Sequence, residues 1–156
     1  MIVAIKSPSL AAHELKATTA QVVVREGHVE VRVYTNTAHL ISALKNEHAW
    51  LMGDIDELMP ANLNADALKR YIKKALSEKI ALNINAQLIP FESVEINHIR
   101  DSDVHDLEVV FQATHALSAV DTLKLSFPSV LGTVHANFVK PSYRLIAPGD
   151  EAFITF

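Results

Sequence analysis

The feature that most constrains the fold of this chain is a double change in the spacing of its apolar residues. Val29, Val31 and Val33 alternate with polar residues, which is typical of a strand with one buried face. The spacing then becomes helical, with one apolar stripe formed by Leu68, Tyr71, Ile72, Ala75 and Leu76. Alternation returns over residues 80–84 and continues toward the end of the chain. The pattern therefore predicts strands, then helices, then strands again.

Turn residues separate the alternating segments. Glu26-Gly27 and Asn85-Ala86 each lie between two apolar runs and predict tight hairpins, since Gly and Asn accept the backbone angles of such turns. The strands are expected within residues 20–25, 28–33, 80–84, 87–89, 94–96, 107–111, 123–127, 134–138, 143–146 and 153–156. Many short strands at close spacing are typical of two packed sheets.

We therefore predict a mainly β fold, an immunoglobulin-like two-sheet antiparallel sandwich. An α-helical insertion over residues 37–78 is expected between the second and third strands, and Thr37 is the predicted N-cap of its first helix. Residues 13–156 are expected to form a single domain, since no linker or internal repeat interrupts them.

Composition excludes several functional classes. The 156 residues carry a net charge of −4, which argues against a nucleic-acid partner. Cysteine is absent, so disulfides, thiolate zinc sites and a cysteine nucleophile are excluded. No segment approaches the roughly 18–20 consecutive apolar residues of a membrane span.

Residues 1–12 have two interpretations. Ser9 and Ala11 stand three residues and one residue before a cleavage point acceptable to a signal peptidase, although no basic segment or long apolar run precedes them. The segment is then the remnant of an export signal whose start lies upstream, and the protein is periplasmic or otherwise extracytoplasmic. The alternative is an N-terminal arm or a short first strand.

Several segments resemble a known family. Residues 12–15 (AHEL), 75–77 (ALS), 80–90 (IALNINAQLIP) and 135–139 (HANFV) are similar to the soluble extracytoplasmic domain of hydrogenase and urease accessory proteins of the HupE/UreJ type. The likeness also extends to exported bacterial β-sandwich proteins of unknown function. It implies a sandwich fold and an extracytoplasmic location. It implies no metal transport and gives no residue a catalytic role, because its segments are apolar strands rather than catalytic motifs.

Histidines offer the candidate metal ligands. His98 and His105 lie in the polar segment 97–106, and a hairpin there would bring imidazole and carboxylate groups to one side, a donor set suited to Cu, Ni or Zn. Their spacing matches no established ligand motif, and the alternative is a solvated loop between strands.

A second metal hypothesis concerns the N-terminus. Cleavage after Ala12 would make His13 the first residue and give one copper ion an amine and an imidazole. This arrangement resembles CopC-type copper carriers, and either His115 or His135 would complete it. Cleavage one residue earlier leaves His13 as an ordinary surface residue.

Trp50, Leu51 and Met52 form an apolar lip within the predicted insertion. The lip is a candidate partner surface for a protein or a lipid-like ligand, and the alternative is that Trp50 folds back as a plug over the end of the sandwich. The nearby acids Asp54, Asp56 and Glu57 are expected to be capping or solubilising charges rather than a catalytic pair.

No nucleophile elbow or phosphate-binding loop is present in the sequence. We therefore expect a non-catalytic extracytoplasmic accessory or interaction module with an envelope protein as its partner. The alternative is a periplasmic carrier or sensor of Cu, Ni or Zn.

Overall fold

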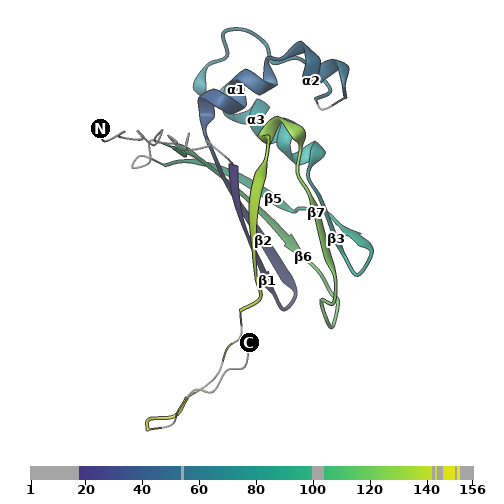
Figure 1. The fold of residues 1–156 in the computed structure, drawn as a ribbon, viewed down its shortest axis with the longest axis vertical. Helices are drawn as coiled ribbons and strands as arrows, with labels where there is room; N and C mark the ends of the chain where they lie inside the picture. The colour runs from purple at the N-terminus through teal and green to yellow at the C-terminus, as the bar shows by residue number, and fades with distance from the viewer. Residues whose placement is uncertain are drawn as a thin grey trace, which may run out of the picture.

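The computed structural model describes residues 18–53, 55–99, 104–141, 143, 146–149 and 151. The described elements are β1 (Thr18–Arg25), β2 (His28–Thr35), α1 (Thr37–Leu44), α2 (Glu47–Leu51), α3 (Ala65–Lys79), β3 (Ala81–Ile84), β4 (Gln87–Ile89), β5 (Ser93–His98), β6 (Leu107–Thr114), β7 (Leu123–Ser126), the 3₁₀ helix η1 (Ser129–Leu131) and β8 (Val134–Val139). The helices gather at one end of the strands (Figure 1).

The strands form two sheets around one core. The larger sheet has the order β5-β6-β2-β1-β8 and the smaller one β4-β3-β7. A single buried cluster takes side chains from both sheets, from α1 and from α3. The prediction of a mainly β protein with two sheets is therefore confirmed for the described residues.

The two predicted hairpins are present. β1 and β2 pair antiparallel with Val22 opposite Val31, and the turn between them places Gly27 at φ +71°. β3 and β4 pair across a turn in which Asn85 and Ala86 have φ values of +49° and +65°. In this second turn, positive φ at both central positions is the geometry that matches the natural twist of paired strands.

The expectation of purely antiparallel sheets is wrong at one edge. β8 pairs parallel with β1, with Thr18 opposite Val134 and Val22 opposite Phe138. The cause lies in η1, whose Val130 and Leu131 are buried and carry the chain from the smaller sheet to the larger one. β8 therefore runs beside β1 in the same direction instead of folding back on β7.

Two of the helices match the apolar spacing. In α3, Ile72 and Leu76 are buried, and Leu68, Tyr71 and Ala75 pack against the core, as the stripe predicted. In α1, Leu40 and Leu44 are fully buried. The cap of α1 differs from the prediction: the Asn36 side chain, rather than that of Thr37, accepts a hydrogen bond from the His39 amide at 3.0 Å. Asn and Thr both satisfy a helix start, so the residue type alone did not decide between neighbours.

Three predicted elements fall wholly or partly outside the described residues. They are the N-terminal segment 1–12 and the late strands 143–146 and 153–156.

Candidate functional site

The lip lies on α2, a helix that the apolar spacing did not predict. Trp50 is 46% exposed, Leu51 70% and Met52 67%, so Trp50 is not a buried plug. The described side chains of α2 neither belong to the buried cluster nor pack against it. Whereas α1 packs on η1 and α3 packs on β5, α2 has no comparable partner among the described elements.

Local hydrogen bonds nevertheless define α2. The Asn46 side chain accepts from the His48 amide at 2.9 Å, and the Met52 amide donates to the His48 carbonyl at 3.0 Å. Gly53 follows with φ +77°, a left-handed conformation that commonly ends a helix. Capping alone does not hold so short a helix in water, because helices below about 12 residues depend on tertiary packing.

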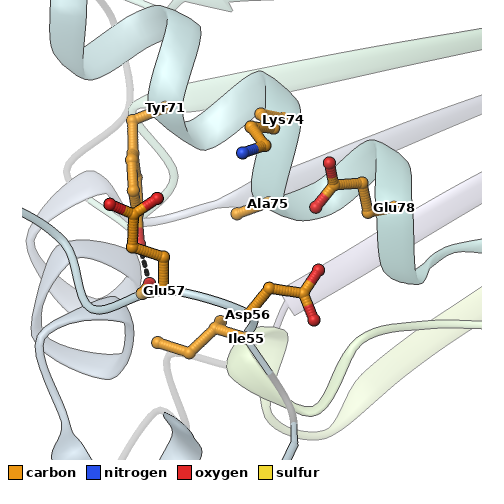
Figure 2. Close-up of a pocket in the computed structure, with 7 residues that line it drawn as sticks. All are labelled: Ile55, Asp56, Glu57, Tyr71, Lys74, Ala75 and Glu78. Carbon is orange, nitrogen blue, oxygen red and sulfur yellow. Dashed lines mark hydrogen bonds between the residues drawn. The ribbon is translucent and has the colours of Figure 1, made fainter.

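The chain is fixed to the core on both sides of the lip. Leu44 precedes it and is fully buried, and Ile55 follows it and is 3% exposed. Beyond Ile55, the Tyr71 hydroxyl of α3 donates a hydrogen bond to the Glu57 carbonyl (Figure 2). The lip is therefore an excursion whose two ends are held by buried side chains.

A small cavity lies between this segment and α3. Its lining side chains are Ile55, Asp56, Glu57, Tyr71, Lys74, Ala75 and Glu78 (Figure 2). Its volume of about 40 Å³ has room for water but not for an organic substrate. Asp56 and Glu57 therefore border a water-sized cavity beside α3.

Polar contacts link this segment to α3. Lys79 Nζ lies 3.1 Å from an Asp56 carboxylate oxygen, and this ion pair holds the pKa of Asp56 below its ordinary value. Burial, with the Glu57 charge nearby, raises the pKa of Tyr71. These contacts give Asp56 and Tyr71 a structural role beside the lip, whereas Asp54 lies outside the described residues.

Of the candidate metal ligands, the structure describes His98 and His105. His98 ends β5 and is exposed, His105 precedes β6 and is half-buried, and the Ile99 amide donates to the Asp106 carbonyl at 2.9 Å between them. Within the described ranges, no group of three or more His, Cys, Asp or Glu side chains is arranged to hold a metal ion. His13 lies outside those ranges.

The histidines expected to complete a site with His13 differ in access. Both ring nitrogens of His115 are enclosed and have no hydrogen-bond partner among the described residues, so a metal could reach them only after rearrangement. His135 is exposed on the edge strand β8, opposite Thr19. In the described part of the chain, neither belongs to a group of three or more His, Cys, Asp or Glu side chains that could hold a metal ion.

Sequence reasoning missed a polar network on the outer face of the larger sheet. Arg32 Nε lies 2.8 Å from Glu30, Arg32 Nη1 lies 3.0 Å from Glu108, and Asn97 donates to the other Glu108 oxygen at 3.1 Å. The Glu30 and Glu108 side chains are only 13% and 15% exposed. The alternation of Glu30 and Arg32 with valines was visible, but the approach of Glu108 depends on the pairing of β2 with β6.

This network changes the titration of its members. The hydrogen bond from Arg32 holds the pKa of Glu30 below its ordinary value. Burial alone would raise the pKa of Glu108, but hydrogen bonds from Asn97 and Arg32 outweigh it and lower the pKa. Burial and the Glu108 charge raise the pKa of Tyr34. The network therefore supports two ionised carboxylates on a partly covered sheet face.

Comparisons with known proteins add no relative: no family model, no curated protein and no solved structure matches the chain. Among the described residues, none of the helices combines the length and the apolar character needed to cross a membrane.

Proposed function

We propose that this protein is a non-catalytic extracytoplasmic accessory or interaction module that contacts a component of the cell envelope through the lip. In this proposal the two sheets form an immunoglobulin-like sandwich similar to the soluble domain of HupE/UreJ-type accessory proteins. The helical segment 37–78 is the insertion that carries the contact surface, and residues 1–12 belong to an export signal.

The single observation that carries the proposal is the exposure of the lip at the end of a helix that lacks the kind of packing partner α1 and α3 have among the described elements. Leu51 and Met52 are 70% and 67% exposed, whereas the other helices bury Leu40, Leu44, Ile72 and Leu76 in the core. Exposing apolar side chains to water is unfavourable, and contiguous exposed apolar residues mark interaction surfaces. The buried Leu44 and Ile55 fix the position of the lip on the fold, as expected for a contact surface on a rigid scaffold.

A site-specific cross-linking experiment tests the proposal. A photoreactive amino acid replaces Leu51 in one variant and Leu88 in another, because these two leucines are similarly exposed at 70% and 65% but lie on different elements. In intact cells that export the protein, illumination is expected to give a discrete adduct with an envelope component from position 51 and none from position 88.

Two outcomes contradict the proposal. Equal labelling from both positions, or none from position 51, removes the lip as the contact surface. Fractionation that finds the native protein only in the cytoplasm removes the extracytoplasmic location.

A further inference from the structure

We propose that the lip inserts into the interfacial layer of a lipid membrane, so that its partner is the lipid surface. This inference rests on the proposed function and names the envelope component that the lip contacts.

The three side chains of the lip point in different directions, which favours a lipid membrane over a protein groove as the partner. Trp50 and Leu51 lie in the last turn of α2, and Met52, its C-cap, keeps helical backbone angles (φ −82°, ψ −3°). Successive residues on a helix point about 100° apart, so the three side chains spread around the end of the helix. A protein groove takes one helix face, with anchors at i, i+3, i+4 and i+7. Lipid chains instead surround an inserted tip on all sides.

The small area of the lip also argues against a protein surface as its partner. A stable protein interface covers about 800 Å² on each partner, contributed by some 20–30 residues. Three side chains fall well short of that area, and the described residues that follow, Ile55 and Leu58, turn back to the core. The same small area argues against a second copy of this chain as the partner. Membrane insertion needs no such area, since each apolar side chain gains separately from leaving water.

The exposed fractions give the lip a depth profile. Within the lip, Leu51 and Met52 are the most exposed, at 70% and 67%, whereas Trp50 is only 46% exposed and so is more covered by the protein. Purely apolar side chains suit the acyl region, and Trp, with an apolar ring and a polar N–H, concentrates at the membrane–water boundary. Lys45 and Asn46, both exposed, precede α2 and would lie at the depth of the headgroups.

Charge decides which lipids are expected. The chain has a net charge of −4, so long-range attraction to anionic headgroups does not drive the contact. Insertion driven by apolar side chains is insensitive to salt, because screening acts only on charges. The lip is therefore expected to bind a neutral lipid surface. A single myristoyl chain binds membranes with a constant of about 10⁴ M⁻¹, and three partly exposed side chains should bind no more tightly.

The experiment uses the full chain and neutral phosphatidylcholine vesicles. Trp50 is the only Trp of the sequence, so its fluorescence reports the lip alone. Millimolar lipid is expected to shift the emission to the blue, brominated phosphatidylcholine to quench it, and 0.5 M salt to leave both effects unchanged. The double variant Leu51→Ser with Met52→Ser retains Trp50 and should lose at least about tenfold in vesicle affinity.

A matched control changes exposed apolar residues elsewhere. Leu88 and Phe138 are 65% and 55% exposed on β4 and β8, and their replacement by Ser should leave vesicle binding unchanged. Circular dichroism of each variant establishes that it is folded before its binding is compared.

Four outcomes overturn the inference. The first is that millimolar lipid does not shift the Trp50 emission of the folded protein, and the second is that the control variant loses as much vesicle affinity as the lip variant. The third is vesicle binding that requires anionic lipid and disappears in salt. The fourth is an emission shift that grows with protein concentration in the absence of vesicles. The last indicates self-association. An adduct with an envelope protein from position 51 together with no vesicle binding overturns the lipid partner and leaves the interaction module standing.

Discussion

The helices α2 and α3 begin in the same way and end with opposite relations to the core. Each has an Asn N-cap whose side chain accepts a backbone hydrogen bond, at 2.9 Å in α2 and 2.8 Å in α3. α3 has 15 residues and buries Ile72 and Leu76, whereas α2 has five residues and exposes Trp50 and Leu51. The difference teaches that capping defines where a helix begins, while packing decides whether it stabilises the fold or remains available for contact.

The largest expected effect separates the two helices by stability. Leu76→Ala removes a fully buried side chain of α3 and should lower the free energy of unfolding by about 2–5 kcal/mol. Leu51→Ala changes an exposed side chain of α2 and should alter it by less than about 0.5 kcal/mol. Urea unfolding followed by circular dichroism measures both. Similar losses in the two variants would show that α2 packs on the core after all.

A smaller effect concerns the caps. Asn64→Ala leaves the amide of Ala67 without its cap and should destabilise the protein by about 1 kcal/mol. Asn46→Ala should have almost no effect on global unfolding, because the described side chains of α2 add nothing to the core. Asn64→Asp retains a capping oxygen and should restore most of the loss in the same urea experiment. A cost at Asn46 equal to that at Asn64 would contradict the contrast.

The smallest expected effect is on the pH dependence of stability, which we compare between the polar network of the larger sheet and the ion pair beside the lip. The pKa values of Glu30 and Glu108 are lowered in the folded protein, so their contribution to stability is full above the ordinary glutamate value of 4.5 and is lost as the pH falls through the lower folded values. Glu108→Gln should therefore flatten the acid side of the stability curve. Asp56 pairs with Lys79 beside the lip but is 63% exposed, so Asp56→Asn should leave the curve nearly unchanged. Melting temperatures between pH 3 and 7 test both variants.

Strand and helix positions were predictable where one face is buried. The valines of β2 and the stripe of α3 each mark the side that meets the core, and the structure buries Val31 and Leu76 as the spacing requires. The direction of β8 was not predictable, because alternation is the same in parallel and antiparallel strands. Its partner is fixed by the path of η1 between the sheets, which depends on burial of Val130 and Leu131.

The candidate site was likewise predictable only in part, since its residue types are visible in the sequence but their exposure is not. The sequence shows that Trp50, Leu51 and Met52 are apolar, but so are Leu40 and Leu44, which are fully buried one helix earlier. A helix of five residues is too short for periodicity to reveal which face is covered, and its exposure depends on the path of the chain from Leu44 to Ile55. The contact of Arg32 with Glu108 likewise required the pairing of β2 and β6.

The pairing of β1 with β8 also sets the order in which the protein can be completed. The hydroxyl of Thr18 donates to the carbonyl of Leu131, 113 positions along the chain, and β1 has no neighbour on that side until β8 has been made. A contact of this range imposes a large loop-closure entropy, which slows folding. On the ribosome, β1 therefore keeps one open edge until residues 134–139 have been made, and β8 then covers that edge of the larger sheet.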